Sequence, residues 1–242
     1  MRVEGVDRGM RDVPALTLEW RDGLFAHWPV DPDRIRPLVP EALALDTREG
    51  TAWVSILPSQ VVAARPRYVP RAAGLTFPQV NLRTYVRYDC RPGVYFLSLD
   101  AATGLGVRLA RAVYDLPYYR ADVDFERSGD DARRVRFDCR RRPGDGPRAG
   151  FAAAYRPTDS PSRADAASRD EFLAERHRLF VVRDGAVWCT RIEHEPWPLC
   201  PAEATVEAES LLTAAGLPAP DGDPVVRYTP GVEATVRTPF RP

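Results

Sequence analysis

Apolar and polar residues alternate over long stretches of the chain, a pattern typical of β-strands with one buried face. Residues 79–90 (QVNLRTYVRYDC) alternate clearly, and a Pro-Gly turn then leads into the apolar segment 94–99. Residues 179–194 form two apolar runs around Asp184-Gly185, a dipeptide that favours two-residue turns between strands. The pattern predicts an antiparallel hairpin at each of these two places.

Shorter runs of the same kind predict the remaining strands. The middle of the chain is interpreted as three antiparallel strands, with a turn at Ser128-Gly129-Asp130-Asp131 between the first two. The strands expected outside the two hairpins are residues 17–30, 51–57, 123–125, 135–139, 150–156 and 231–238.

Capping residues and apolar residues at helical spacing predict a few short helices. Asp31 and Pro32 begin the first, and Ser168 with Glu171 forms a capping box at the start of the third. Gly216 is expected to end the last. The predicted helices are residues 34–39, 101–113, 168–178 and 202–215.

About nine strands against three or four short helices indicate an α+β fold dominated by antiparallel β-structure. Antiparallel strands in this number must close or stack, because open edges invite aggregation. A closed barrel or cone of roughly nine strands with a few short peripheral helices fits best. No internal repeat and no long linker divides the sequence, so we expect a single domain over residues 1–242 with its core at about 17–239.

The chain contains no lysine, so all 34 of its basic residues are arginine. A lysine amine is the usual protein nucleophile for imine formation with carbonyl compounds and with pyridoxal phosphate. The guanidinium of arginine stays protonated and cannot replace it. Lysine-dependent Schiff-base enzymes, P-loop NTPases and kinases are therefore excluded.

The formal charge is balanced, with 34 basic and 34 acidic residues. This balance gives no electrostatic reason to expect a nucleic-acid or membrane partner. One stretch is rich in arginine, and we interpret it as a solvated strand face, with phosphate or RNA contact as the alternative. Its members are Arg133, Arg134, Arg136 and Arg140 to Arg142.

Features of secretion, membrane insertion and metal binding are not found in the sequence. Residues 1–13 are charged and lack the apolar stretch of a secretion signal, and no apolar run approaches the ~18–20 residues of a membrane span. His194-Glu195 resembles the start of a zincin motif, but Pro198 stands where the second histidine is required. We expect a cytoplasmic protein with no cofactor and no metal site.

The cysteines agree with that expectation. None of the four belongs to a CxxC pair, which favours reduced and mostly buried thiols over a structural zinc site. They are Cys90, Cys139, Cys189 and Cys200.

Four polar side chains share one face of the strand predicted at 79–90, because side chains alternate along a strand. They are Gln79, Asn81, Arg83 and Tyr85. This face either meets solvent or lines a polar pocket inside a barrel. In a pocket, Arg83 could hold a carboxylate through two parallel hydrogen bonds.

Tyrosines and histidines supply the other candidate groups. Residues 114–120 (YDLPYYR) are either a rigid aromatic corner or a source of phenols, Tyr118 and Tyr119, for a ligand cavity. His27 and His194 lie in aromatic surroundings and are either hydrogen-bonded core residues or catalytic acid–base groups. His177 is expected on the surface of a charged helix.

Five ordered segments together resemble the YqjF-like family of uncharacterised bacterial and archaeal proteins, from about Trp20 to Pro239. They are WRDGLFAHWPVDPDRIRPLVPEAL, FPQVNLRTYVRYD, YFLSLDA, YDLPYYRA and HEPWPL. That family is similar in fold to acetoacetate decarboxylase, so the resemblance implies a β-cone or barrel around an apolar pocket.

The resemblance does not carry the decarboxylase reaction with it. In the decarboxylase, a lysine that follows an aromatic-rich segment forms the imine. The matching stretch here is Tyr114 to Tyr119, so tyrosines stand where the lysines would be. A glutamate of the decarboxylase falls near Gln79, which cannot act as an acid or base.

We therefore expect a small-molecule pocket that takes an organic acid or another carbonyl compound. Arg83 would hold the anionic group, Tyr118 or Tyr119 would donate a hydrogen bond, and His27 or His194 would carry a proton. A non-catalytic binding or regulatory module on the same scaffold is the alternative, and either could form a homo-oligomer.

Arg83 and Tyr118 are predicted to face one internal cavity. A buried arginine needs a partner, because an isolated interior charge is costly. The expected partner is Asp100, Glu195, a tyrosine hydroxyl or an anionic ligand.

Overall fold

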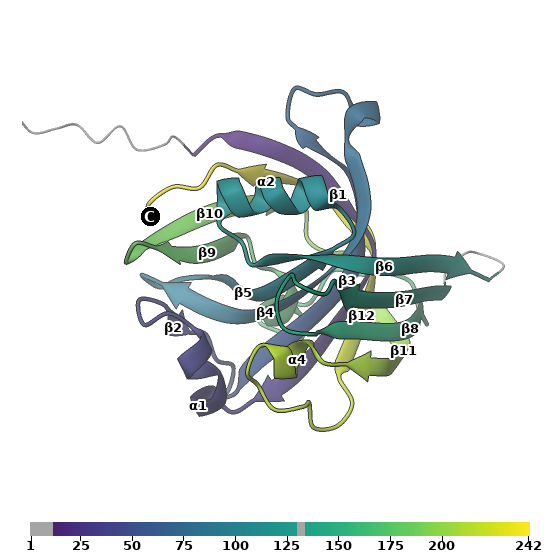
Figure 1. Ribbon diagram of the computed structural model, residues 1–242. Helices are drawn as coiled ribbons and strands as arrows, with labels where there is room; N and C mark the ends of the chain where they lie inside the picture. Colours follow the sequence, from purple (N-terminus) through teal and green to yellow (C-terminus); the bar gives the residue numbers. More distant parts are fainter. Residues whose placement is uncertain (1–11, 130–133) are drawn as a thin grey trace, which may run out of the picture.

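Strands dominate the computed structural model, which describes residues 12–129 and 134–242 (Figure 1). Twelve strands lie within these ranges: β1 (Pro14–Val30), β2 (Ala44–Leu45), β3 (Ala52–Pro66), β4 (Leu75–Tyr88), β5 (Arg91–Ala101), β6 (Tyr118–Ser128), β7 (Arg134–Arg141), β8 (Gly150–Pro157), β9 (Arg178–Arg183), β10 (Ala186–His194), β11 (Cys200–Glu209) and β12 (Val225–Arg237).

Strand pairing closes the sheet into two rings that share a wall formed by β1, β3 and β4. The first ring runs β1–β3–β4–β5–β9–β10–β12 and returns to β1. The second leaves β5 through β6–β7–β8–β11 and rejoins the first at β12. Neighbours are antiparallel except for β5–β6 and β5–β9, which are parallel. The predicted closed, mainly antiparallel architecture is confirmed.

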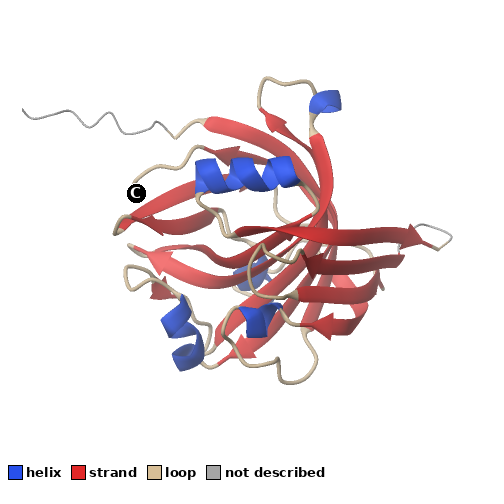
Figure 2. Ribbon diagram, viewed as in Figure 1, coloured by secondary structure: helices blue, strands red, loops and turns tan. Residues whose placement is uncertain are grey.

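Helices are short pieces around the strands (Figure 2). They are α1 (Pro32–Ile35), α2 (Gly104–Tyr114), α3 (Arg169–Ala174) and α4 (Leu211–Ala214), with 3₁₀ turns at η1 (Arg36–Leu38) and η2 (Arg71–Ala73). Among the described residues, no helix has the length and apolar character needed to cross a bilayer.

Both predicted hairpins form, but the turn of the first lies at Asp89 and Cys90, and the expected turn residues Pro92 and Gly93 belong to β5. Strands β4 and β5 pair antiparallel from Gln79 opposite Ala101 to Tyr88 opposite Arg91. Strands β9 and β10 turn at Asp184 and Gly185, whose φ angles are 48° and 74°. Positive φ at both positions is what a tight turn between twisted strands requires.

Asp31 and Ser168 cap their helices as predicted, but Glu171 bonds the amide before the N-cap residue instead of completing the capping box, and α3 is shorter than expected. The Asp31 side chain accepts a hydrogen bond from the Asp33 amide at 2.9 Å. Ser168 Oγ accepts one from the Glu171 amide at 3.1 Å, and Glu171 Oε2 accepts one from the Ala167 amide at 2.5 Å. Helix α3 ends at Ala174, well before the predicted end at Arg178.

The helix predicted over residues 202–215 is wrong. Residues 200–209 are strand β11, and only α4, followed by Gly216, is helical there. Alanine and glutamate favour helices, but their apolar and charged positions alternate with a period of two. The inward alanines pack on the core, while Glu203 and Glu207 pair with arginines of β8 and β7. Strand β2 is the other one the sequence did not predict.

Part of the arginine-rich stretch forms ion pairs with neighbouring acids on the exposed sheet. Arg136 contacts Glu207 at 2.9 Å, and Arg140 contacts Asp138 at 2.8 Å. Arg133, and the Asp130-Asp131 part of the predicted turn, lie outside the described residues.

The shared wall separates the main core from a second interior space. Alternate residues of β1, β3 and β4 point into the main core, where they meet aromatic side chains of β7, β8 and β9. Core members include Leu24, Ile56, Leu82, Phe137, Phe151 and Phe180. The residues between them face the inside of the first ring.

Candidate functional site

A cavity of about 560 Å³ lies inside the first ring of strands. Its walls are mostly apolar and come from all seven strands of that ring, with Leu18, Val61, Phe77, Phe96, Leu179, Ile192 and Val236 among them. Helix α2 contributes Leu105, Leu109 and Val113, which are also about half exposed, at 51%, 54% and 46%. These residues therefore form the rim where the cavity meets solvent.

One wall of this cavity is polar. Gln79, Asn81 and Arg83 line it from β4, and all three are buried. Val80 and Leu82, which lie between them in sequence, point to the opposite side and belong to the main core. Strand alternation thus places this polar face inside the barrel and not in solvent.

Arg83 has no acidic partner within the described residues. Its Nη2 donates to the Leu173 carbonyl at 3.0 Å, while its Nε has no hydrogen-bond partner. The guanidinium carbon lies 5.6 Å and 5.8 Å from the ring centroids of Phe25 and Tyr85, close enough for cation–π attraction. Among residues 12–129 and 134–242, this buried positive charge at the cavity wall has no counter-ion.

Neither acid proposed as a partner for Arg83 fills that role. Asp100 forms a buried, bidentate pair with Arg141, at 2.7 and 3.0 Å. The Glu195 side chain is largely exposed and contacts Arg163 at 3.6 Å. A second arginine that lines the cavity, Arg176, does have a counter-ion, because it contacts Asp46 at 2.5 Å.

Tyr118 lines the same cavity, so the predicted meeting of Arg83 and Tyr118 is confirmed. Its hydroxyl donates to Gln79 Oε1 at 3.1 Å. Burial raises the pKa of Tyr118 well above its usual range, so the phenol stays protonated and acts as a donor.

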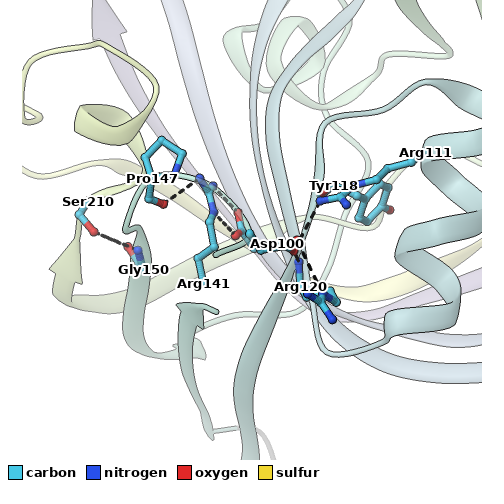
Figure 3. A network of polar contacts seen from close by, with 9 residues as sticks. Asp100, Arg111, Tyr118, Arg120, Arg141, Pro147, Gly150 and Ser210 are labelled. Atoms are coloured by element: carbon cyan, nitrogen blue, oxygen red, sulfur yellow. Dashed lines mark hydrogen bonds and ion pairs between the residues drawn. The ribbon is translucent and has the colours of Figure 1, made fainter. Parts of the chain in front are cut away.

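Tyr119 is not in this cavity. As the next residue of β6 it faces the other way, and the Arg141 guanidinium stacks on its ring at 3.7 Å. Figure 3 shows Arg141 between the Asp100 carboxylate and the Pro147 carbonyl. Tyr119 therefore covers a buried ion pair on the far side of the sheet.

Tyr85 and His27 lie behind the cavity wall in a chain of buried hydrogen bonds. Ser55 Oγ contacts His27 Nδ1 at 2.5 Å and the Tyr85 hydroxyl at 2.5 Å. The Tyr85 hydroxyl also reaches the Leu173 carbonyl at 2.8 Å. Burial, with a smaller effect of Arg83, holds the pKa of His27 well below its usual range. This arrangement matches the interpretation of His27 as a hydrogen-bonded core residue.

His194 does line the cavity, at the end of β10. Its Nδ1 donates to the Glu195 carbonyl at 2.7 Å, which assigns the proton to Nδ1 and leaves a lone pair on Nε2. Burial is the main cause that lowers the pKa of His194 to about 4, so the ring is neutral at physiological pH.

His177 stacks on His194, with ring centroids 4.4 Å apart. It was expected on a helix, but it follows the end of α3 and is half exposed. Glu175 completes this group, since one ligand atom from each of the three residues lies within 4.8 Å of the others. Sequence reasoning missed this trio, although the Glu-x-His spacing at 175–177 was a local signal for it.

Comparison with known proteins places these features in a family. The chain is 43% identical over 219 residues to the uncharacterized protein YqjF of Bacillus subtilis (strain 168), covering 86% of this chain and 85% of that protein. The model of the DUF2071 family, described as an uncharacterized conserved protein, matches residues 17–233.

Solved structures with the same fold are enzymes of the acetoacetate decarboxylase type and a biosynthetic relative. The enduracididine biosynthesis enzyme MppR, complexed with pyruvate, superposes with a TM-score of 0.66 at 14% identity, over 98% of this chain and 93% of that one. An acetoacetate decarboxylase-like enzyme from Sphingomonas wittichii RW1 gives 0.65 at 14% identity, over 95% and 94%. Acetoacetate decarboxylase from Legionella pneumophila gives 0.61 at 11% identity, over 99% and 90%.

The structural likeness confirms the fold that the sequence resemblance implied. The family match covers both the strands that build the cavity wall and the segment that carries His177 and His194. On these grounds the chain belongs to the DUF2071 family, the family of YqjF.

Proposed function

We propose that the protein binds a small organic acid in the cavity of the first ring, with the carboxylate on Arg83. The observation that carries this proposal is the buried guanidinium of Arg83, which lines the cavity with an unpartnered Nε and has no acid in contact within the described residues. A buried charge without a counter-ion is unfavourable. A carboxylate ligand would supply the missing charge and could accept two parallel hydrogen bonds.

The remaining walls indicate the rest of the ligand. A cavity of about 560 Å³ is of a size typical for small-molecule sites, and its mostly apolar lining suits an alkyl or aryl body. Asn81 Oδ1 is buried without a hydrogen-bond partner, and it could accept a bond from a hydroxyl or amino group of the ligand. A solved structure of MppR, which shares the fold, is a complex with pyruvate, a small acid.

Calorimetric titration with matched probes tests this proposal. Hexanoate and hexanamide have the same apolar tail, but only hexanoate carries a charge, and pyruvate provides a smaller acid. We expect the two acids to bind and the amide not to bind. Charged hydrogen bonds contribute about 1.5–3 kcal/mol, so Arg83→Met should weaken acid binding roughly tenfold or more.

The matched control is Arg136→Met, which removes an exposed arginine that pairs with Glu207 outside the cavity. It should leave acid binding unchanged. Equal affinity for the amide and the acid, or full affinity in Arg83→Met, would contradict the proposal.

Proton transfer on the bound acid is the second candidate function, favoured by the open Nε2 of His194 at the same cavity. In this reaction Nε2 takes a proton from the carbon next to a ligand carbonyl and returns it. The Tyr118 hydroxyl turns from Gln79 to the developing enolate oxygen. An imine with an internal lysine is excluded, because the chain has no lysine.

Exchange of pyruvate methyl protons in heavy water, followed by NMR, tests this second function. The protein should accelerate exchange, and His194→Gln should abolish the acceleration while pyruvate still binds. If exchange proceeds only at the protein-free rate, the protein is a binding module.

A further inference from the structure

We propose that Glu175, His177 and His194 form a three-ligand site for a divalent transition metal ion such as Zn²⁺. Glu175 and His177 follow helix α3, and His194 ends β10, so the fold brings together ligands from two segments. One ligand atom of each residue lies within 4.8 Å of the others. Two imidazoles and one carboxylate are a donor set that zinc and other first-row metals use in catalytic sites.

Backbone contacts hold one side-chain atom of each of the three residues. His194 Nδ1 donates to the Glu195 carbonyl at 2.7 Å, and His177 Nδ1 faces the Ile192 carbonyl at 3.3 Å. Each ring therefore keeps a free lone pair on Nε2. Backbone carbonyls on the far nitrogen are the partners that metal-binding histidines usually have.

The carboxylate is fixed in the same way. Glu175 Oε1 accepts a hydrogen bond from the Trp197 amide at 2.7 Å. Its other oxygen, Oε2, lies 3.7 Å from His177 Nε2. One atom of each ligand is thus anchored by the backbone, while the atom that would bind the metal faces the cluster.

Only a small rearrangement is needed to close the site. Ligands at zinc–ligand distances of about 2.0–2.2 Å in a tetrahedral site lie about 3.4 Å apart. The ligand atoms, which lie within 4.8 Å of one another, must approach by up to about 1.4 Å. The stacked rings must also turn so that their lone pairs converge. His177 is half exposed, so its ring has room to turn and solvent has a path to the site.

The site would be open toward the cavity, because His194 and Trp197 line the cavity wall. A three-ligand site leaves a coordination position for water or a ligand atom. For this part the inference rests on the proposed function: an acid bound to Arg83 could reach the metal with a carbonyl or carboxylate oxygen. His194 Nε2 would then be a ligand, and it could not also accept a substrate proton.

Titration of the chelator-treated, tag-free protein with Co²⁺ tests metal binding without any organic ligand. We expect one equivalent of bound Co²⁺, with visible d–d absorption bands that Zn²⁺ displaces. His177→Ala should weaken binding more than tenfold, and it should fold normally because it changes a half-exposed ring. Glu175→Gln should act likewise, since its amide can still accept the hydrogen bond from Trp197.

Two control variants remove groups that could capture the ion by themselves. Cys90→Ser removes an exposed thiol and Glu195→Gln an exposed carboxylate next to the site, and both should keep full affinity. Absence of stoichiometric binding, or full affinity in His177→Ala, would show only a hydrogen-bonded cluster and overturn the proposal.

The outcome can be separated from that of the proposed function. Hexanoate binding is measured on the chelator-treated protein and is expected to depend on Arg83 and not on the three metal ligands. Hexanoate binding can therefore fail while Co²⁺ binds, and Co²⁺ binding can fail while hexanoate binds. In the pyruvate exchange assay, His177→Ala should remove activity if a metal is required and preserve it if His194 acts as a free base.

Discussion

Arg83 and Tyr85 donate to the same acceptor, the backbone carbonyl of Leu173, at 3.0 and 2.8 Å. The two side chains share a strand face, but only Arg83 reaches the cavity. Tyr85 lies one step deeper, where Ser55 links it to His27. The Leu173 carbonyl joins a side chain that faces the cavity to one that is enclosed, and substitutions should separate their roles.

Replacing each of these two residues should have opposite consequences. Arg83→Met removes a buried charge without an acidic partner, so the free energy of unfolding should stay the same or rise while acid binding is lost. Tyr85→Phe removes a buried hydroxyl that contacts Ser55, His27 and the Leu173 carbonyl, and it should cost about 1–3 kcal/mol, with binding largely kept. Urea denaturation and calorimetry on both variants check this. A large loss of stability in Arg83→Met would mean that the guanidinium is structural.

The buried pair of Asp100 and Arg141 should be the most sensitive polar contact of the second ring. Both side chains are almost fully buried, at 1% and 3% exposure. Asp100→Asn leaves the Arg141 charge uncompensated and should cost about 3–5 kcal/mol. Replacing both with leucine and methionine should cost less than this single change. Urea denaturation measures both values, and equal losses would show that the charges are not coupled.

His27 should make stability depend on pH. Its pKa in the folded protein is held well below the value of about 6.5 that it has when unfolded, because the ring is buried and positive charges of Arg83, Arg169 and Arg227 act on it. Below about pH 6.5, His27 takes up a proton in the unfolded state but stays neutral in the folded state. The free energy of unfolding should therefore decrease as the pH is lowered below about 6.5, by up to about 1.4 kcal/mol per pH unit.

His27→Gln keeps a polar group beside Ser55 but does not titrate. In this variant, the slope of the free energy of unfolding against pH should lose the part that His27 contributes. The other titrating groups are common to both proteins, so they cancel in the difference between the two slopes. Denaturation curves between pH 7 and 5 check this. Identical slopes would show that His27 is protonated in the folded state.

Thiol reactivity should single out Cys90. Cys139, Cys189 and Cys200 are buried, and burial raises the pKa of Cys139 and raises that of Cys189 to about 11. Thiolates are the reactive form, so a disulfide reagent should modify one thiol in the native protein and four after unfolding. Cys90→Ser should leave none reactive in the native state.

The sequence predicted those parts of the fold that depend on short-range patterns. Alternation on β4 placed Gln79, Asn81 and Arg83 on one face, and the hairpin turn at Asp184 needed only two residues. Strand β11 was missed because its alanines and glutamates favour helices in isolation. Its alternation becomes favourable only when Glu203 and Glu207 meet the arginines of β8 and β7.

The candidate site could be predicted only in part, for a similar reason. Tyr118 and Tyr119 are adjacent and of the same residue type, and only the register of β6 against β5 decides that Tyr118 lines the cavity. His27 and His194 read alike in sequence, but one is enclosed and the other reaches the cavity wall. The trio of Glu175, His177 and His194 joins segments that meet only in the folded chain.

The wall shared by the two rings gives the chain a freedom that matters over evolutionary time. Along β1, β3 and β4, neighbouring residues have different roles. One set packs in the main core, and the other lines the cavity. If the cavity binds a ligand as proposed, point mutations at Asn81 or Ser59 would alter what it recognises, while Leu82 and Ile56 would still pack the core. Selection can therefore explore new ligands at little cost in stability, which is how one architecture comes to host unrelated chemistries.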